Sequence, residues 1–302
     1  MTTEEWDFES LVETSKAVDL RAIAASTQTM YATCLKMYAL RLSEMKNPST
    51  PYPLTVEKIR AFVMYVGKRY DYGYSYLRNF KAAFTYWART NDHFDVTVEM
   101  REFWKGLKNE MIGDFLPKAV KPITITQMEE MAKMCVLGTF REIQMMTLFS
   151  VMFYGFLRIG EALALTWEDI KLTEEGGVTI FIKKSKADQT GHGDTVHISS
   201  SENPPLYHPS SWVRRLQKYE HSRPFIVSPN CVRDNLKDLL RRMMVVDRIS
   251  THSFRKGGAH AAALAGIQDC MIKRHGRWKS AVYQRYTAVQ MSTAGTTITK
   301  VL

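Results

Sequence analysis

The stretch IQMMTLFSVMFYGFLRIGEALAL, residues 143–165, decides the fold of the second half of the chain. Residues 143–157 are apolar nearly all round, the pattern of a helix buried on every side. The run is shorter than the ~20 residues of a membrane span. It ends at Arg158, and an unpaired buried guanidinium is costly, so Arg158 needs a partner. Glu161, three residues later, is our candidate, although a purely structural Arg–Glu pair explains this segment equally well.

The segments on either side of this helix predict a mixed domain. VTIFI (178–182) and TVHI (195–198) alternate as two strands, joined by the glycine-containing loop KKSKADQTGHGD. Upstream, Thr126-Gln127-Met128-Glu129 matches a capping box that opens a helix. Everything after about residue 205 has helical character. We therefore predict a mainly α-helical domain with a small antiparallel β-sheet.

The amino-terminal half shows helical spacing of apolar residues. Stripes run from Tyr31 to Leu42, from Val56 to Val66 and from Leu77 to Trp87, with Thr55 as a plausible N-cap and a fourth stripe hinted at by Phe103 and Leu107. We expect these aromatic stripes to form a core. The chain then divides into a flexible arm (1–20), a helical bundle (21–112), a linker (113–124), the mixed domain (125–286) and a tail (287–302).

Composition narrows the class of protein. The 302 residues are 45% hydrophobic and 24% charged, typical of a globular chain. The acidic amino terminus has no apolar stretch, so we expect no signal or transit peptide. The cysteines form no C-x-x-C pair and are predicted to be buried thiols of a reducing compartment: Cys34, Cys135, Cys231 and Cys270. A secreted protein, a membrane protein and a cysteine-zinc module are all disfavoured.

The net charge of +10 is concentrated in one part of the chain. Residues 1–200 carry 24 basic and 25 acidic side chains, whereas residues 201–302 carry 17 basic and 6 acidic ones. A basic block in a foldable sequence indicates a surface that meets a polyanion, and nucleic acid is the leading candidate. A solvated basic face is the alternative explanation.

Two further segments carry candidate functional residues. In THSFRKGG, His252 and Arg255 are three residues apart, so a helix beginning there presents both near its amino terminus, where backbone N–H groups attract anions. In RHGRWKSAVYQRY, one tryptophan and two tyrosines, Tyr283 and Tyr286, are interleaved with basic residues.

Together these segments closely resemble the motifs of the tyrosine recombinases (phage-integrase-like proteins). The sequence around Trp278 and Tyr286 is similar to that of the crypton-like mobile-element group. The resemblance covers nearly the whole chain and implies a helical core-binding domain followed by a catalytic domain. It implies that Tyr286 is the nucleophile and that the other catalytic residues are Arg158, Glu161, Lys186, His252, Arg255 and Trp278. Lys183 and Lys184 are the less favoured lysines. Trp278 and Tyr286 are one residue closer than is commonest in the family, so Tyr283 is the fallback nucleophile.

These residue types suit phosphodiester cleavage. Two arginines can clamp the non-bridging oxygens of a phosphate whose negative charge grows in the transition state. The tyrosine attacks phosphorus, and a lysine returns a proton to the departing 5′ oxygen as general acid. The covalent 3′-phosphotyrosyl product conserves the bond energy, so we expect neither ATP nor a metal ion, and no cofactor.

The resemblance also implies partners. We expect double-stranded DNA, a tetramer assembled on two DNA sites, and exchange of the 287–302 tail between subunits. An intracellular location is expected, nuclear if the host is eukaryotic. A DNA-binding protein without strand exchange, and a type IB topoisomerase-like or resolvase-like enzyme, are the alternatives. The candidate DNA-backbone contacts are Arg274, Arg277, Lys279 and Arg285.

Overall fold

The computed structural model describes residues 23–92, 95–112, 120–184, 192–200 and 202–287. The chain divides into two compact units, Met1–Pro117 and Lys118–Leu302, each with its own hydrophobic core. The expected arm, most of the expected linker and all but the first residue of the expected tail lie outside the described residues. No helix in the described ranges is both long enough and apolar enough to cross a membrane.

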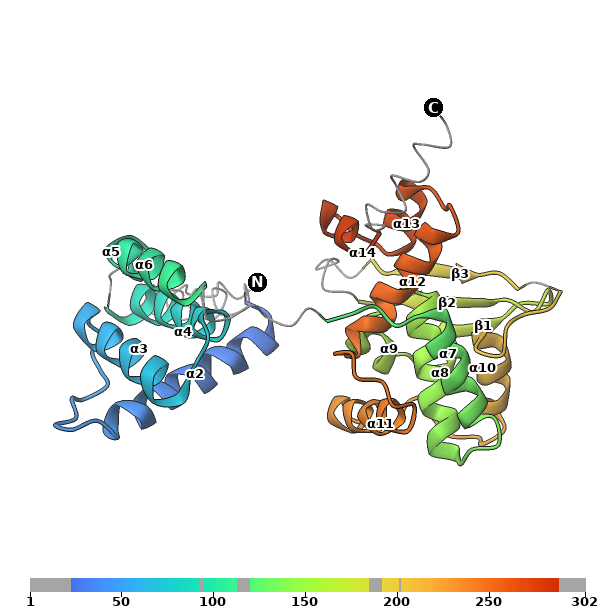
Figure 1. Ribbon diagram of the computed structural model, residues 1–302, viewed down its shortest axis with the longest axis horizontal. Coiled ribbons are helices and arrows are strands. Elements are labelled where there is room, and N and C mark those ends of the chain that lie inside the picture. Colours follow the sequence, from blue (N-terminus) through green and yellow to red (C-terminus); the bar gives the residue numbers. More distant parts are fainter. Residues whose placement is uncertain (1–22, 93–94, 113–119, 185–191, 201, 288–302) are drawn as a thin grey trace, which may run out of the picture. The chain divides into compact units, whose positions relative to one another are not determined.

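The amino-terminal unit is a helical bundle around an aromatic core. Tyr38, Phe62 and Phe84 are fully buried, and the ring of Tyr38 lies 5.1 Å from that of Phe62 and 5.0 Å from that of Phe84. The predicted stripes are therefore core, and Thr55 caps its helix by accepting from the Lys58 N–H. The helices are α2 (Ala25–Ser43), α3 (Val56–Tyr70), α4 (Tyr74–Trp87) with a π-helical extension (Ala88–Asp92), α5 (Val96–Glu99) and α6 (Arg101–Ile112) (Figure 1).

The carboxy-terminal unit is built around one buried helix. Every residue from Ile143 to Phe153 is buried, as the apolar run predicted, and this helix packs against four others. The helices are α7 (Ile125–Cys135), α8 (Phe140–Tyr154, the buried one), α9 (Ile159–Leu163), α10 (Pro209–Gln217), α11 (Pro229–Arg242), α12 (His252–Leu264), α13 (Asp269–His275) and α14 (Gln284–Thr287), with 3-10 turns at Trp167–Asp169 and Ala281–Tyr283. Those packed on α8 are α7, α9, α10 and α12 (Figure 1).

A three-stranded antiparallel sheet lies in the same unit, in the order β1-β2-β3. The predicted hairpin is present as β2 (Val178–Ile182) and β3 (Asp194–Ile198), with Ile180 opposite Val196. β1 (Ile170–Leu172) was not predicted, because three residues are too few to show an alternating pattern.

The capping box lies two residues before its predicted position. Thr124, not Thr126, is the N-cap of α7: its hydroxyl accepts from the Gln127 N–H at 3.1 Å, and its own N–H donates to the Gln127 side chain at 3.0 Å. Both T-x-x-Q at 124 and T-x-x-E at 126 satisfy the sequence rule. The helix uses the first of the two, and Met128 and Met131 are buried on one of its faces.

All four cysteines are free thiols. Cys34 and Cys135 are buried, as expected, whereas Cys231 is half-buried and Cys270 is exposed. The prediction of a buried thiol was wrong for Cys270 because α13 turns Ile272 inward and leaves its first turn on the surface.

Candidate active site

Arg158 is positioned by the turn that ends α8. Helix α8 stops at Gly155, and Phe156 takes a left-handed φ of 48°, so that Arg158 becomes the N-cap of α9. Its Nη1 lies 2.6 Å from Oε1 of Glu161, and its backbone N–H donates to Oε2 at 2.9 Å. Glu161 is thus the partner of Arg158. The Arg158 side chain is 30% exposed, which leaves part of the guanidinium accessible to a ligand.

Arg255 lies in the first turn of α12 and is fully buried. Its Nη1 donates to the Phe156 carbonyl and its Nη2 to the Gly276 carbonyl at 2.5 Å. The guanidinium carbon lies 4.5 Å from the centre of the Trp278 ring. Among the residues that the structure describes, nothing accepts from Nε of Arg255. A buried donor left without an acceptor costs free energy, and a phosphate oxygen is an acceptor of the right chemistry.

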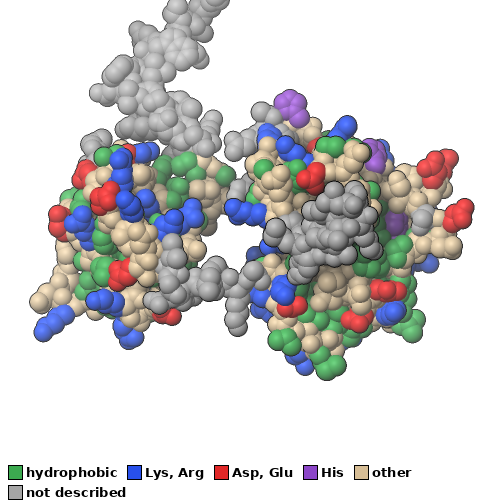
Figure 2. All heavy atoms as spheres, turned by 45° about the horizontal axis from the view of Figure 1, so that its top comes forward, with side chains coloured by type: hydrophobic (Ala, Val, Ile, Leu, Met, Phe, Trp, Pro, Cys, Tyr) green, Lys and Arg blue, Asp and Glu red, His purple; other side chains and the backbone are tan. Residues whose placement is uncertain are grey.

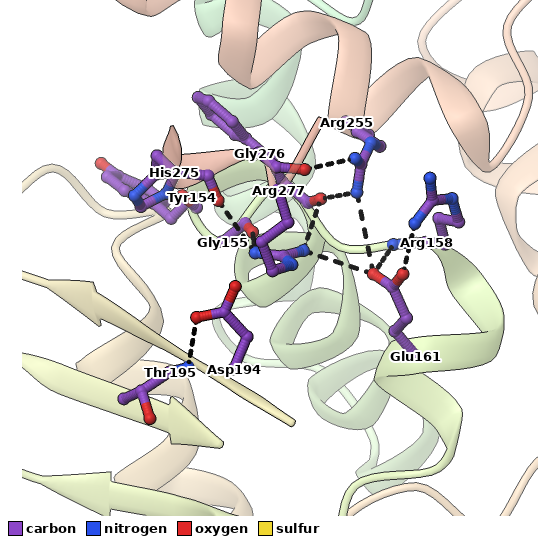
Figure 3. Close-up of polar contacts among 11 residues, drawn as sticks. Tyr154, Gly155, Arg158, Glu161, Asp194, Thr195, Arg255, His275, Gly276 and Arg277 are labelled. Atoms are coloured by element: carbon purple, nitrogen blue, oxygen red, sulfur yellow. Dashed lines mark hydrogen bonds and ion pairs between the residues drawn. The ribbon is translucent and has the colours of Figure 1, made fainter. Parts of the chain in front are cut away.

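Arg277 is not a surface side chain, contrary to its predicted role as a DNA contact. It is only 6% exposed and points inward (Figure 3). Its Nη2 lies 3.3 Å from Oε2 of Glu161, and its other bonds go to the carbonyls of Gly155, Phe156 and His275. Arg277 has a φ of 56°, and this left-handed backbone places its side chain under the preceding turn.

Three arginines therefore surround one carboxylate. Oε2 of Glu161 accepts from the Arg158 N–H and from Arg277, and lies 3.7 Å from Nη1 of Arg255 (Figure 3). Counting formal charges, the cluster carries a surplus of two positive charges. Such a surplus, partly desolvated, suits an anionic ligand.

The predicted nucleophile lies beside the predicted histidine. The hydroxyl oxygen of Tyr286 is 3.1 Å from Nε2 of His252, and its ring lies 5.8 Å from the ring of Trp278. The fallback nucleophile, Tyr283, is buried, and its ring stacks on the ring of Trp278. Its hydroxyl oxygen lies 3.4 Å from the carboxylate of Asp269. The geometry favours Tyr286 over Tyr283.

The electrostatics link these groups. Desolvation, followed by the charges of Arg255, Lys256 and Arg158, lowers the pKa of His252 to about 4, so its imidazole is neutral at pH 7. Desolvation and the charge of Arg158 lower the pKa of Arg255 to about 9, against a raising effect of Glu161. Burial alone would raise the pKa of Glu161, but hydrogen bonds from Arg158 and the charge of Arg277 outweigh it and hold that pKa below its usual value.

The third predicted element of the site is the general-acid lysine. Lys186 lies outside the described residues, between β2 and β3 in the sequence. Lys183 is engaged at the end of β2: its Nζ lies 3.0 Å from the buried carboxylate of Asp169 and 3.2 Å from the hydroxyl of Thr166. Lys184 is exposed. Lys183 is thus held by Asp169 and Thr166.

Two residues of α12 that lie near Tyr286 were not predicted from the sequence. Nζ of Lys256 lies 5.5 Å from the centre of the Tyr286 ring and donates to the Val120 carbonyl. Nδ1 of His260 lies 3.2 Å from the backbone oxygen of Tyr286. The spacing His252, Lys256, His260 places all three on one helical face, a signal that was present in the sequence.

Basic side chains also lie on the surface of each unit. Of the predicted DNA contacts, Arg274, Lys279 and Arg285 are exposed. In the amino-terminal unit, a groove of about 850 Å³ is lined by Arg78, Lys81 and Arg89 together with tyrosines and threonines. Figure 2 shows Lys and Arg side chains on the visible face of both units.

No protein-family model and no curated protein matches the chain. Solved structures do. The Tn1549 transposon integrase in complex with circular-intermediate DNA shares 14% identity at a TM-score of 0.63, over 95% of this chain and 98% of that one. The XerH recombinase bound to difH substrate shares 14% identity (TM-score 0.62; 89% and 78% covered), and a lambda integrase dimer bound to a core site shares 13% (0.59; 93% and 77%). The chain therefore has the fold of the tyrosine recombinases and integrases.

Proposed function

We propose that the protein is a site-specific DNA recombinase that cuts and rejoins duplex DNA through a covalent 3′-phosphotyrosyl intermediate. The observation that carries the proposal is the meeting of Arg158, Arg255, His252 and Tyr286 in one place, although they come from segments far apart in the sequence. A protein that only binds DNA has no need of a tyrosine hydroxyl beside a neutral histidine in a cluster of arginines.

The arginines supply the phosphate site. Arg158 offers an exposed guanidinium edge and Arg255 offers an unsatisfied Nε, so both can donate to non-bridging oxygens. The charge of the reacting phosphate becomes more negative in the transition state, and a preorganised surplus of positive charge stabilises that state more than the ground state. The protein's own cations meet this need, so we propose a reaction that requires no metal ion and no cofactor.

The proton transfers follow from the neutral state of His252. In the tautomer whose hydrogen is on Nδ1, Nε2 of His252 accepts the hydroxyl proton as the Tyr286 oxygen attacks phosphorus. The bond from phosphorus to the 5′ oxygen breaks, and we propose that Lys186 protonates that oxygen. The products are a phosphotyrosyl ester and a free 5′ hydroxyl, and attack by the 5′ hydroxyl of a second strand reverses the step.

We propose that both units contact double-stranded DNA. The groove lined by Arg78, Lys81 and Arg89 offers the amino-terminal unit a site for phosphates. In the carboxy-terminal unit the exposed Arg274, Lys279 and Arg285 would do the same. Phosphate contacts position a protein on the duplex without reading its sequence.

We further propose assembly into a tetramer with exchange of residues 287–302. An apolar pocket of about 620 Å³ supports this proposal, and its lining includes Phe153 of α8, Ala262 of α12 and Met271 of α13. Met271 is 56% exposed, and a segment from a neighbouring copy would cover it. Disulfide trapping between a cysteine placed in the tail and Met271→Cys would join two chains if the tail is exchanged, and would close within one chain if it is not.

A nicked-duplex library tests the proposed function. Each duplex carries a nick next to a randomised centre, so that cleavage releases the short 5′-hydroxyl fragment and traps the protein on DNA. We expect covalent complexes whose sequenced junctions share one site. DNA binding without any covalent complex would indicate a binding protein. Covalent complexes without recombination between two plasmids carrying the recovered site would indicate a topoisomerase-like or resolvase-like enzyme.

A further inference from the structure

Both Nη groups of Arg277 are engaged inside the protein. Its two Nη atoms make four contacts, with Glu161 and with the carbonyls of Gly155, Phe156 and His275, at distances from 2.9 to 3.3 Å. Four N–H groups on Nη1 and Nη2 match these four acceptors. With 6% of the side chain exposed, Arg277 has no Nη donor left for DNA. Its Nε is buried and has no acceptor among the described residues, so the Nη groups act on a phosphate only through Glu161 and the turns that they hold.

Arg277 compensates the negative charge of Glu161. Glu161 orients Arg158 through two hydrogen bonds, but its negative charge also offsets the positive charge that a phosphate would meet. Arg277 approaches the same carboxylate from the interior and compensates that charge. The two arginines that face the reaction, Arg158 and Arg255, then keep their full attraction for the phosphate.

The contacts of Arg277 also hold the turns that carry these arginines. Phe156 and Arg277 both have left-handed backbones, and such conformations are strained in residues other than glycine. The Phe156 carbonyl accepts from both Arg255 and Arg277. The Gly276 carbonyl, one residue before Arg277, accepts from Arg255. The turn before Arg158 and the turn before Trp278 are thus joined by two guanidinium groups (Figure 3).

We infer that Arg277 is a positioning residue for DNA cleavage: it compensates the charge of Glu161 and fixes its carboxylate so that Arg158 and Arg255 converge on the reacting phosphate. The inference rests on the proposed function, since it concerns the same reaction. It makes Arg277 act through Glu161, which a double-mutant cycle can detect.

The test compares R277M, E161Q and the double variant with the wild-type protein on a nicked duplex that traps the covalent complex. The rate of complex formation at saturating DNA is measured beside the Kd for the duplex and the Tm of each protein. We expect R277M to slow the rate by about 100-fold, the scale of a misplaced reacting group. The Kd should stay within about threefold, because phosphate contacts elsewhere dominate affinity. In the E161Q background, the same substitution should cost less than about fivefold.

Controls separate positioning from folding. R233M removes an exposed arginine of α11 that contacts only Asn230 among its described polar partners, and should leave rate and Kd unchanged. If R277M does not fold, the cycle is run with R277Q, which removes the charge but keeps a polar side chain with donors. A wild-type rate in R277M or R277Q, or an equal loss with and without E161Q, would overturn the inference. Absence of a covalent complex with the wild-type protein would instead count against the proposed function.

Discussion

Nε2 of His252 lies 3.1 Å from the hydroxyl oxygen of Tyr286, although 34 residues separate them in the chain. The contact brings the first residue of α12 to the short helix α14, and the two rings meet edge to face at an interplanar angle of 75°. Since burial and neighbouring cations keep His252 neutral, this contact is a hydrogen bond between a phenol and an imidazole.

The depressed pKa of His252 predicts acid sensitivity. The folded-state pKa is about 4 and the usual value is 6.5, so the unfolded chain binds more protons between those pH values. Stability therefore falls as the pH drops from about 6.5 to 4. Allowing for partial exposure, His252 contributes about 1–2 kcal/mol to this loss. Urea unfolding at several pH values should show a shallower dependence in His252→Gln.

Desolvation also lowers the pKa values of His208 and His275. The stability of His252→Gln should therefore still depend on pH, but less steeply than that of the wild-type protein. His197→Gln, at an exposed position on β3, serves as the control and should follow the wild-type curve. Parallel curves for His252→Gln and the wild-type protein would contradict the neutral, buried state of His252.

Glu161 is predicted to be essential for stability. Its side chain is 4% exposed, and its removal leaves the buried Arg255 and Arg277 without a carboxylate. Breaking a buried ion pair on one side costs about 3–5 kcal/mol. Hydrogen exchange of α8 should report such a loss in Glu161→Ala, because α8 forms the core of the unit. The exposed Glu130→Ala should change nothing, and equal protection in both variants would be the contrary result.

Close packing of α12 on α8 predicts that Gly258 tolerates no side chain. A Cβ at this position would lie 2.0 Å from the Phe153 carbonyl oxygen and 2.6 Å from the ring of Phe156. The α8 backbone and the α12 backbone cannot move apart without shifting the turn before Arg158. Gly258→Ala should therefore destabilise the unit by about 3 kcal/mol. Gly160, with open space around its Cβ position, is the matched control. Its alanine variant should be as stable as the wild-type protein by thermal unfolding, and a similar Tm for both variants would refute the prediction.

Substitution of Arg158 should slow DNA cleavage far more than it weakens DNA binding. Its side chain is 30% exposed, and we propose that it contacts one phosphate, whereas affinity depends on many phosphate contacts. Arg158→Ala should slow covalent-complex formation by about 10²–10³-fold, the cost of a lost transition-state donor. The Kd of the duplex should change by less than about fivefold and still rise steeply with salt. A parallel loss of rate and affinity, or a flat salt response, would argue against this assignment.

Local patterns in the sequence predicted the elements that carry the site. The apolar run 143–157 specified a buried helix, and the i, i+3 spacing of Arg158 with Glu161 specified their contact. β1 was missed because three residues show no periodicity. The N-cap of α7 was misplaced because two overlapping segments obey the same rule.

The burial of Arg277 could not be predicted from local patterns. In the sequence it is one of several basic residues around Trp278, all of which look suited to a surface. Only the left-handed turn at Arg277 and the chain reversal at Phe156 bring it to Glu161, 116 residues away. Burial of a charge by distant parts of the chain depends on tertiary packing, which cannot be predicted from a short sequence segment.

The identity of the tyrosine that becomes joined to DNA tests the central claim most directly. Protein trapped on a nicked duplex is digested, and the DNA-linked peptide is sequenced by mass spectrometry, for the wild-type protein and for Tyr286→Phe and Tyr283→Phe. We predict DNA on Tyr286, no covalent complex in Tyr286→Phe, and a complex retained in Tyr283→Phe. DNA attached to Tyr283 or to any other residue, or a complex that survives Tyr286→Phe, would contradict the account.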